Sequence, residues 1–227
     1  MTGEIKKGDP TALGVFAYGF SLFVLSLYAA GMFPWSESIM MIAVSIGFGG
    51  IFLLTASIWE YNNGNTFGAT AFGTYSAFFL VFGLAHIGLK LSWFTAVPVG
   101  HLIGMMALSF VIMTLIYTVA SLKMTKVHFL MLFVLLWVFV LYAIPLLTLN
   151  AAGTTTAFGA FSASNGTNPS LMPAGWVGII DALITFYLGG SVVINDRWEK
   201  AGFSAPLPLL PFKPKAQVKK VETPSTH

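Results

Sequence analysis

The sequence predicts an all-α integral membrane protein with six transmembrane helices around a pore within each protomer. Of its 227 residues, 56% are hydrophobic and only 8% are charged, whereas a soluble domain carries about 25% charged residues. Lipid offers no hydrogen-bond partner to an open backbone, so an apolar stretch long enough to cross a bilayer is expected to be helical. Six such stretches contain no Lys or Arg: Leu13–Phe33, Ile39–Trp59, Phe67–Leu89, Val97–Leu122, Phe129–Leu149 and Ala174–Ile194.

The distribution of basic residues predicts the orientation. With both termini in the cytoplasm, ten of the eleven Lys and Arg residues lie on the cytoplasmic side, and only Lys90 lies outside, as the positive-inside rule requires. We therefore expect a multi-pass protein of the cell membrane, either plasma or inner. It would have a cytoplasmic segment (1–12), a transport domain (13–194) and a Pro- and Lys-rich cytoplasmic tail (195–227) that can contact anionic membrane lipid. The basic charge is a topology signal, so nucleic acid is not an expected partner.

The first span begins after a helix-start signal. Asp9 is expected to cap the helix and Pro10 to occupy its first position. Hydroxyl groups, glycine and tyrosine then recur at helical spacing on one face: Thr11, Gly14, Tyr18, Ser21 and Tyr28. This face either lines a narrow wet path or forms buried hydrogen bonds between helices.

A polar stretch, "EYNNGNTFGATAFGTYSAFF" (60–79), joins the second and third spans. Asn65 or Thr66 can cap the third span, which then aligns Gly68, Ala71 and Tyr75 on one face. The start of a helix presents unpaired N–H groups that favour an anion. Two such starts on one side of the membrane predict an anion mouth, although capping alone would explain both. Its residues would be Asp9, Pro10, Gly14, Asn65, Thr66 and Gly68.

The remaining spans contain few polar groups. His86, Lys90 and His101 are expected near the outer ends of the third and fourth spans, where they either form an outer vestibule that attracts anions or are ordinary interfacial residues. Asp181 is the only acid deep within a span. It is either a proton carrier or a structural hydrogen-bonding group. Small residues recur at helical spacing in the fourth and sixth spans, which favours close helix packing.

Three segments resemble the acetate uptake transporter family, which includes the succinate-acetate permeases. "DPTALGV" resembles its N-terminal signature, "EYNNGNTFGATAFGTYSAFF" its central block, and "AGWVGIIDALITFYLG" its last span. The resemblance implies a six-helix protomer, a homohexamer and passage of small monocarboxylates through a constriction at Tyr18, Tyr75 and Val134. Asp9 and Tyr18 depart from the residues usual in that family, which are Asn and Phe. The outer loop (150–173) is longer than expected.

The predicted function is therefore membrane transport of acetate and related small carboxylate anions, by an anion channel or a proton-coupled pathway. The alternative is a channel for neutral solutes such as urea or amides, whose architecture is similar. Ser76 lacks the G-x-S-x-G motif of a hydrolase, so we do not expect an enzyme. No cysteine is present to form a thiolate metal site, and no metal or other cofactor is expected.

Overall fold

The computed structural model describes residues 8–148 and 170–212, and all of its regular elements there are helical. Six helices are long and apolar enough to cross a membrane. This confirms the predicted all-α membrane fold. The elements are α1 (Thr11–Ala29), η1 (Trp35–Glu37), α2 (Ile39–Val44), η2 (Ser45–Phe52), α3 (Leu53–Asn62), α4 (Thr66–Lys90), α5 (Ala96–Ser121), α6 (Lys126–Leu147) and α8 (Met172–Lys200).

Two predicted spans end at least four residues away from their predicted ends, and the other four end within three residues of them. Helix α1 stops at Ala29 rather than Phe33, because Gly31 takes a positive φ of 79° that reverses the chain. Helix α8 continues to Lys200 rather than Ile194. Its last two turns therefore belong to the segment that the sequence assigned to the tail. The predicted outer loop lies almost entirely outside the described residues.

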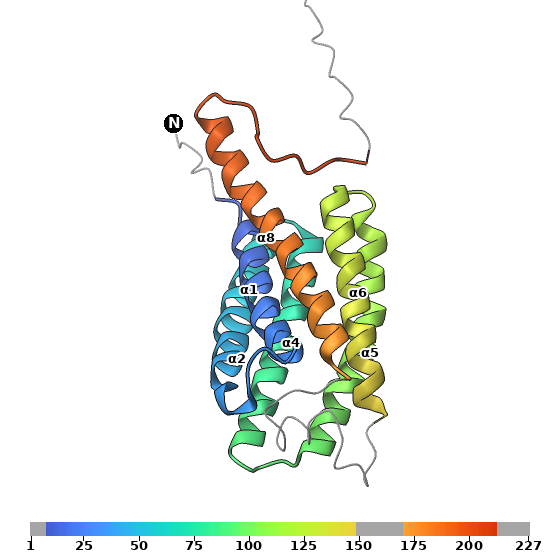
Figure 1. Cartoon of the computed structure of the whole chain (residues 1–227). Helices are drawn as coiled ribbons and strands as arrows, with labels where there is room; N and C mark the ends of the chain where they lie inside the picture. Colours follow the sequence, from blue (N-terminus) through green and yellow to red (C-terminus); the bar gives the residue numbers. More distant parts are fainter. Residues whose placement is uncertain (1–7, 149–169, 213–227) are drawn as a thin grey trace, which may run out of the picture.

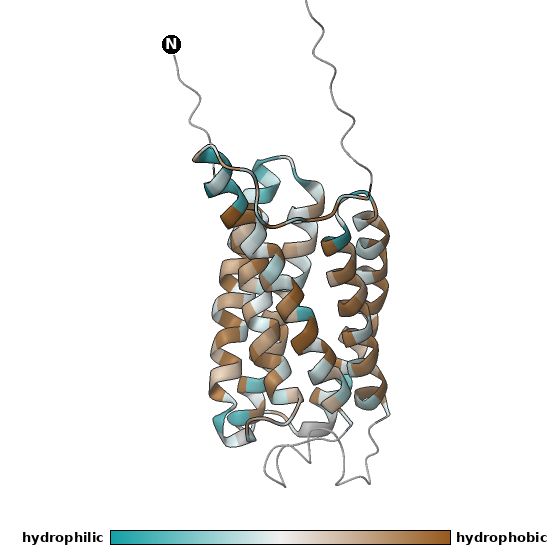
Figure 2. Ribbon diagram, turned by 45° about the horizontal axis from the view of Figure 1, so that its top comes forward, coloured by the Kyte–Doolittle hydropathy of each residue, from teal (hydrophilic) through white to brown (hydrophobic). Residues whose placement is uncertain are grey.

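The six spans form one bundle whose two described chain ends lie at the same end (Figure 1). Helix α1 packs mainly against α8, α5 against α6, and α3 against α4. Hydrophobic residues cover the middle of the bundle, and hydrophilic residues gather towards its two ends (Figure 2). This distribution fits a protein whose flanks face lipid and whose ends face water.

The second span is not a regular α-helix. Its middle, η2, is a π-helix that contains three of the chain's glycines. A Cβ on Gly49 would lie 2.4 Å from the Phe79 ring, and one on Gly50 would lie 2.3 Å from Leu80. The glycines thus let α4 approach η2 closely. The Ser76 hydroxyl donates to the Gly50 carbonyl over 2.8 Å, so Ser76 joins these helices, in keeping with its lack of a hydrolase motif.

Small residues bring α8 against α1. The sequence predicted close packing of the sixth span but not which helix it packs against. A Cβ on Gly175 would lie 2.2 Å from the backbone nitrogen of Ala30, and one on Gly178 would lie 2.2 Å from the Ser26 hydroxyl. Such contacts leave no room for a larger residue. The position of α8 along α1 is therefore fixed by backbone shape.

Candidate functional site

A cavity of about 280 Å³ opens at the end of the bundle where the first and last described residues of the chain lie. Its wall combines side chains from α1, α4, α6 and α8, including Val15, Tyr18, Ala71, Tyr75, Leu132, Leu135 and Leu188. The deeper wall is apolar and aromatic, and polar groups gather at the mouth. A cavity of this size can admit a small organic solute.

The mouth is organised by a buried carboxylate, Glu60, which is only 2% exposed. Its Oε1 accepts a hydrogen bond from the Thr11 hydroxyl over 2.6 Å, and its Oε2 accepts one from Asn65 Nδ2 over 2.8 Å. Glu60 lies in the last turn of α3, Thr11 begins α1 and Asn65 precedes α4. One side chain therefore joins three helix ends at the cavity mouth.

Both predicted helix starts are capped, but not in the same way. Asn65 is confirmed as the cap of α4, because its Oδ1 accepts from the Gly68 amide over 3.1 Å. At α1 the prediction was wrong by one residue: the helix begins at Thr11 and Pro10 stands at its cap position. The Asp9 carboxylate still accepts from the Thr11 amide over 2.9 Å. Side chains of the protein thus already bond one N–H group at each helix start.

The six predicted mouth residues do not all reach this cavity. Asp9, Asn65 and Gly68 line it. Pro10 lines a neighbouring surface hollow instead, and Thr66 is exposed. Gly14 has a packing role, because a Cβ there would lie 2.3 Å from the Phe72 ring.

The cavity ends at a cluster of aromatic rings in the middle of the bundle. The ring centroids of Tyr18 and Tyr75 are 5.5 Å apart. Phe79 lies 6.2 Å from Tyr18, while Phe110 and Phe139 lie 5.7 Å and 6.2 Å from Tyr75. Tyr18 and Tyr75 line the cavity and are 5% and 4% exposed. The structure therefore brings together the two tyrosines that the resemblance placed at a constriction.

Each of these tyrosines bonds to a side chain of another helix. The Tyr18 hydroxyl donates to Asp181 Oδ2 over 3.2 Å. The Tyr75 hydroxyl lies 2.9 Å from the hydroxyl of Thr114. Asp181 is fully buried, and its Oδ1 has no hydrogen-bond partner among the described residues. The acid singled out in the last span thus lies directly behind Tyr18.

Val134 does not accompany the tyrosines. It does not line the large cavity, nor the smaller cavity described below. Its neighbour Leu135 does line the large cavity and is 1% exposed. One residue turns an α-helix by about 100°, so an alignment error of one position moves a side chain to another face. The structure therefore places Leu135 in the cavity wall and does not bring Val134 there.

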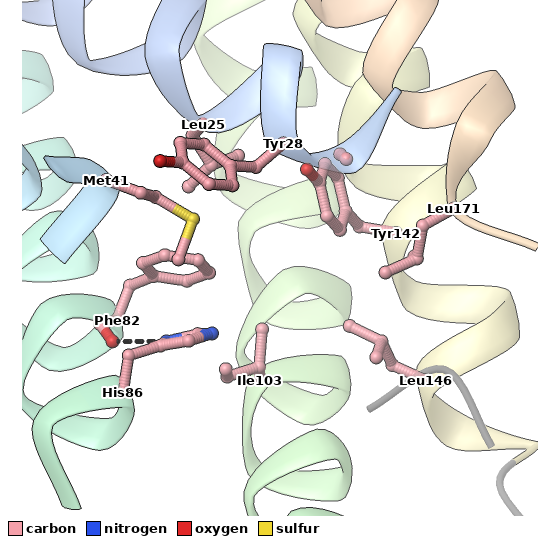
Figure 3. A pocket seen from close by; sticks show the side chains of 10 residues that line it. Leu25, Tyr28, Met41, Phe82, His86, Ile103, Tyr142, Leu146 and Leu171 are labelled. Carbon is pink, nitrogen blue, oxygen red and sulfur yellow. Dashed lines mark hydrogen bonds between the residues drawn. The ribbon is translucent and has the colours of Figure 1, made fainter. Parts of the chain in front are cut away.

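A second, smaller cavity of about 20 Å³ lies towards the other end of the bundle (Figure 3). Its volume suffices for about one water molecule. His86 and Phe82 from α4 face Tyr28, Tyr142 and Ile103 across it. His86 Nδ1 lies 2.7 Å from the Phe82 carbonyl, and the Tyr28 hydroxyl donates to the Glu37 carbonyl over 2.6 Å.

The predicted outer vestibule is only partly assembled. His86 lines the small cavity, but Lys90 and His101 do not. Lys90 is exposed at the end of α4, and its Nζ lies 3.4 Å from the Ser36 carbonyl. The three residues therefore do not share one cavity.

Three residues at or behind the cavity wall were not identified as site residues from the sequence: Glu60, Thr114 and Leu135. A signal existed for Glu60, because an acid at the end of an apolar span is costly to bury without partners. No comparable signal marks Thr114, since threonines also occur in small-residue packing faces.

Comparison with known proteins is consistent with this geometry. Residues 2–207 match the sequence family described as GPR1/FUN34/yaaH. The succinate-acetate/proton symporter SatP of Escherichia coli K12 is 30% identical over 196 residues, which cover 86% of this chain and 94% of that protein. Acetate permease A of Emericella nidulans is 25% identical over 227 residues, covering 96% of this chain and 72% of the permease. A solved structure of the bacterial acetate channel SatP superimposes with a TM-score of 0.74 at 28% identity. The match covers 90% of this chain and 99% of that one.

Proposed function

The chain belongs to the GPR1/FUN34/yaaH family, and we propose that it carries acetate and related small monocarboxylates across the cell membrane. The observation that supports this most directly is the 280 Å³ cavity, which ends at the close pair Tyr18 and Tyr75 inside a six-helix membrane bundle. The names of its relatives, an acetate permease and an acetate channel, supply the substrate class.

The proposed path runs from the large cavity, past the two tyrosines, to the small cavity beside His86. A carboxylate enters at the polar mouth formed by Asp9, Glu60, Asn65 and Gly68. The aromatic cluster then separates the two cavities, and a hydrophobic constriction of this kind can gate a path by excluding water.

Flux in proteoliposomes tests the substrate class. Purified protein is expected to speed equilibration of labelled acetate at least several-fold over protein-free vesicles, which correct for diffusion of the neutral acid through lipid. Labelled urea, measured in the same vesicles, distinguishes the alternative of a neutral-solute channel. Accelerated urea passage without accelerated acetate passage would reject the proposed function.

Both termini face the cytoplasm in this proposal, because ten of the eleven Lys and Arg residues then lie inside. The chain has no native cysteine, so labelling of a single introduced cysteine shows on which side of the membrane that position lies. In intact cells, Thr95→Cys is expected to react with an impermeant maleimide, and Asn63→Cys only after permeabilisation. Both positions are exposed in turns between spans. Labelling of Asn63→Cys from outside would overturn this orientation.

Proton coupling is assigned to Asp181 in this proposal. A charged acid at the centre of a bilayer costs about 2.5–3.5 kcal/mol on insertion scales. Asp181 is fully buried with one oxygen unpartnered among the described residues, so the neutral, proton-loaded form suits the site. Its bond to Tyr18 places that proton beside the path.

The protomers assemble as a homohexamer in this proposal, which rests on the family resemblance alone. Native mass spectrometry from detergent measures the number of chains directly.

A further inference from the structure

Two buried side chains behind the aromatic cluster bond the hydroxyls of Tyr18 and Tyr75. These are Asp181 on α8 and Thr114 on α5. Both are 0% exposed, and neither lines the large or the small cavity. We propose that Asp181 and Thr114 are positioning residues that hold the two tyrosine rings across the path and so set the largest carboxylate that passes. This inference rests on the proposed transport function and adds to it the residues that determine size selectivity.

The Asp181 anchor is rigid because α8 cannot slide along α1. Gly178, one turn before Asp181, has room for no Cβ beside Ser26, since the added atom would lie 2.2 Å from its hydroxyl. One turn after Asp181, Thr185 approaches Gly19 so closely that a Cβ there would lie 2.9 Å from Thr185 Cγ2. Close contacts thus flank Asp181 on both sides. Its carboxyl group is held at a fixed height behind the Tyr18 ring.

The Thr114 anchor orients a ring that packing alone leaves free to adjust. The Tyr75 ring lies between Phe110, Tyr117 and Phe139, at centroid distances of 5.7, 5.8 and 6.2 Å. Ring contacts at these distances tolerate a wide range of angles between the ring planes. The hydrogen bond to Thr114 selects one orientation, in which the hydroxyl is held behind the cavity wall.

Both bonds hold the tyrosine hydroxyls against neighbouring helices, so the path meets mainly ring edges and faces at this level. If an anchor is lost, the freed hydroxyl is buried without a partner, which is unfavourable. The nearest water lies in the large cavity, so the hydroxyl is expected to turn towards it and move the ring. A displaced ring no longer closes the path to larger acids.

Thr114→Val removes the hydroxyl of the Thr114 anchor with minimal change in side-chain shape. The ratio of lactate flux to acetate flux in proteoliposomes is expected to rise about fivefold, the change that one hydrogen bond of ordinary strength can produce. Thr118→Val is the matched control. Thr118 lies one turn further along α5 and is also buried, but its hydroxyl donates only to the Thr114 backbone carbonyl, over 2.7 Å. The control should leave the flux ratio unchanged.

The Asp181 anchor is tested with Tyr18→Phe, Asp181→Leu and the double variant. Asp181→Leu frees the Tyr18 hydroxyl and is expected to raise the lactate-to-acetate ratio. Tyr18→Phe leaves no hydroxyl to turn towards the cavity, so adding Asp181→Leu to it should raise the ratio much less than Asp181→Leu does in the wild-type protein. Asp181→Asn keeps an oxygen that can accept from Tyr18 and is expected to keep the size limit. Thr185→Val is the control on α8, because Thr185 donates only to the Asp181 backbone carbonyl.

The outcomes separate this inference from the function it rests on. If wild-type protein carries acetate but Thr114→Val and Asp181→Leu both keep the wild-type flux ratio, the positioning role is overturned and transport stands. Strictly additive effects of Tyr18→Phe and Asp181→Leu would also overturn the role of their bond. If wild-type protein carries no acetate, the proposed function itself fails. Gel filtration of each variant in detergent establishes that it is folded before flux is compared.

Discussion

Replacing Tyr75 with alanine is expected to raise the flux of lactate relative to acetate about tenfold, because discrimination by the shape of an apolar site amounts to about 10- to 200-fold for a change of one methylene. Tyr75 lines the large cavity, faces Tyr18 at 5.5 Å and packs against Phe110 and Phe139. Truncation of Tyr75 removes its ring contacts with all three of these aromatic side chains. The measurement is uptake of a series of labelled acids of increasing size by proteoliposomes.

Truncation of a buried ring also weakens packing, commonly by about 3–5 kcal/mol in a protein core. Phe23→Ala controls for this effect, because Phe23 packs against the core and contacts Phe186 but lines neither cavity. The control should leave the size series unchanged. If folded Tyr75→Ala protein shows the wild-type size series, the constriction lies at another level of the bundle.

Asp181→Asn is expected to abolish accumulation of acetate driven by a pH gradient while sparing exchange of labelled acetate at equilibrium. Asparagine keeps the shape and can still accept from Tyr18, but it cannot bind and release a proton. Moving an anion into a negative-inside vesicle costs about 2.3 kcal/mol per 100 mV, which corresponds to about fifty-fold in concentration. A carrier that moves one proton with each anion avoids this cost, and a carrier without the proton does not.

The measurement compares acetate accumulation at short times in vesicles with an imposed pH gradient and membrane potential, after subtraction of uptake by protein-free vesicles. Asp196→Asn is the matched control, since Asp196 lies on the same helix but is exposed and paired with Lys200. Accumulation by Asp181→Asn at the wild-type level would leave Asp181 with a structural role only. The transport pathway would then be an anion channel.

The glutamate at the cavity mouth shows how far local sequence signals extend. The cap at Asn65 was predictable because a cap and the amide it accepts from lie three residues apart. The partners of Glu60 were not, because Thr11 is 49 positions away. A buried acid in an apolar protein signals that partners exist, but the sequence does not say which ones.

The helix face that borders the cavity was likewise predictable for one span and not for another. The polar face of the third span was correct: Gly68, Ala71 and Tyr75 all line the large cavity. On α6, where almost every residue is apolar, nothing in the sequence marks the face towards the path. Leu135 lines the large cavity, and Val134, the residue expected there, does not. Where lipid and the bundle interior are equally apolar, hydrophobic periodicity does not distinguish them.

The sequence by itself determined the membrane class, the six spans and a helix start at Asn65 or Thr66, because these depend on composition and on residues a few positions apart. It also marked Asp181 as an acid that needs an explanation. Only the tertiary structure decided that Asp181 lies behind Tyr18, that Thr114 lies behind Tyr75, and that Lys90 and His101 do not line the cavity of His86. The physical reason is that the spans follow from backbone hydrogen bonding in lipid, which is local. The contact between Tyr18 and Asp181, which are 163 positions apart, depends instead on how closely the small residues of α1 and α8 allow these helices to approach.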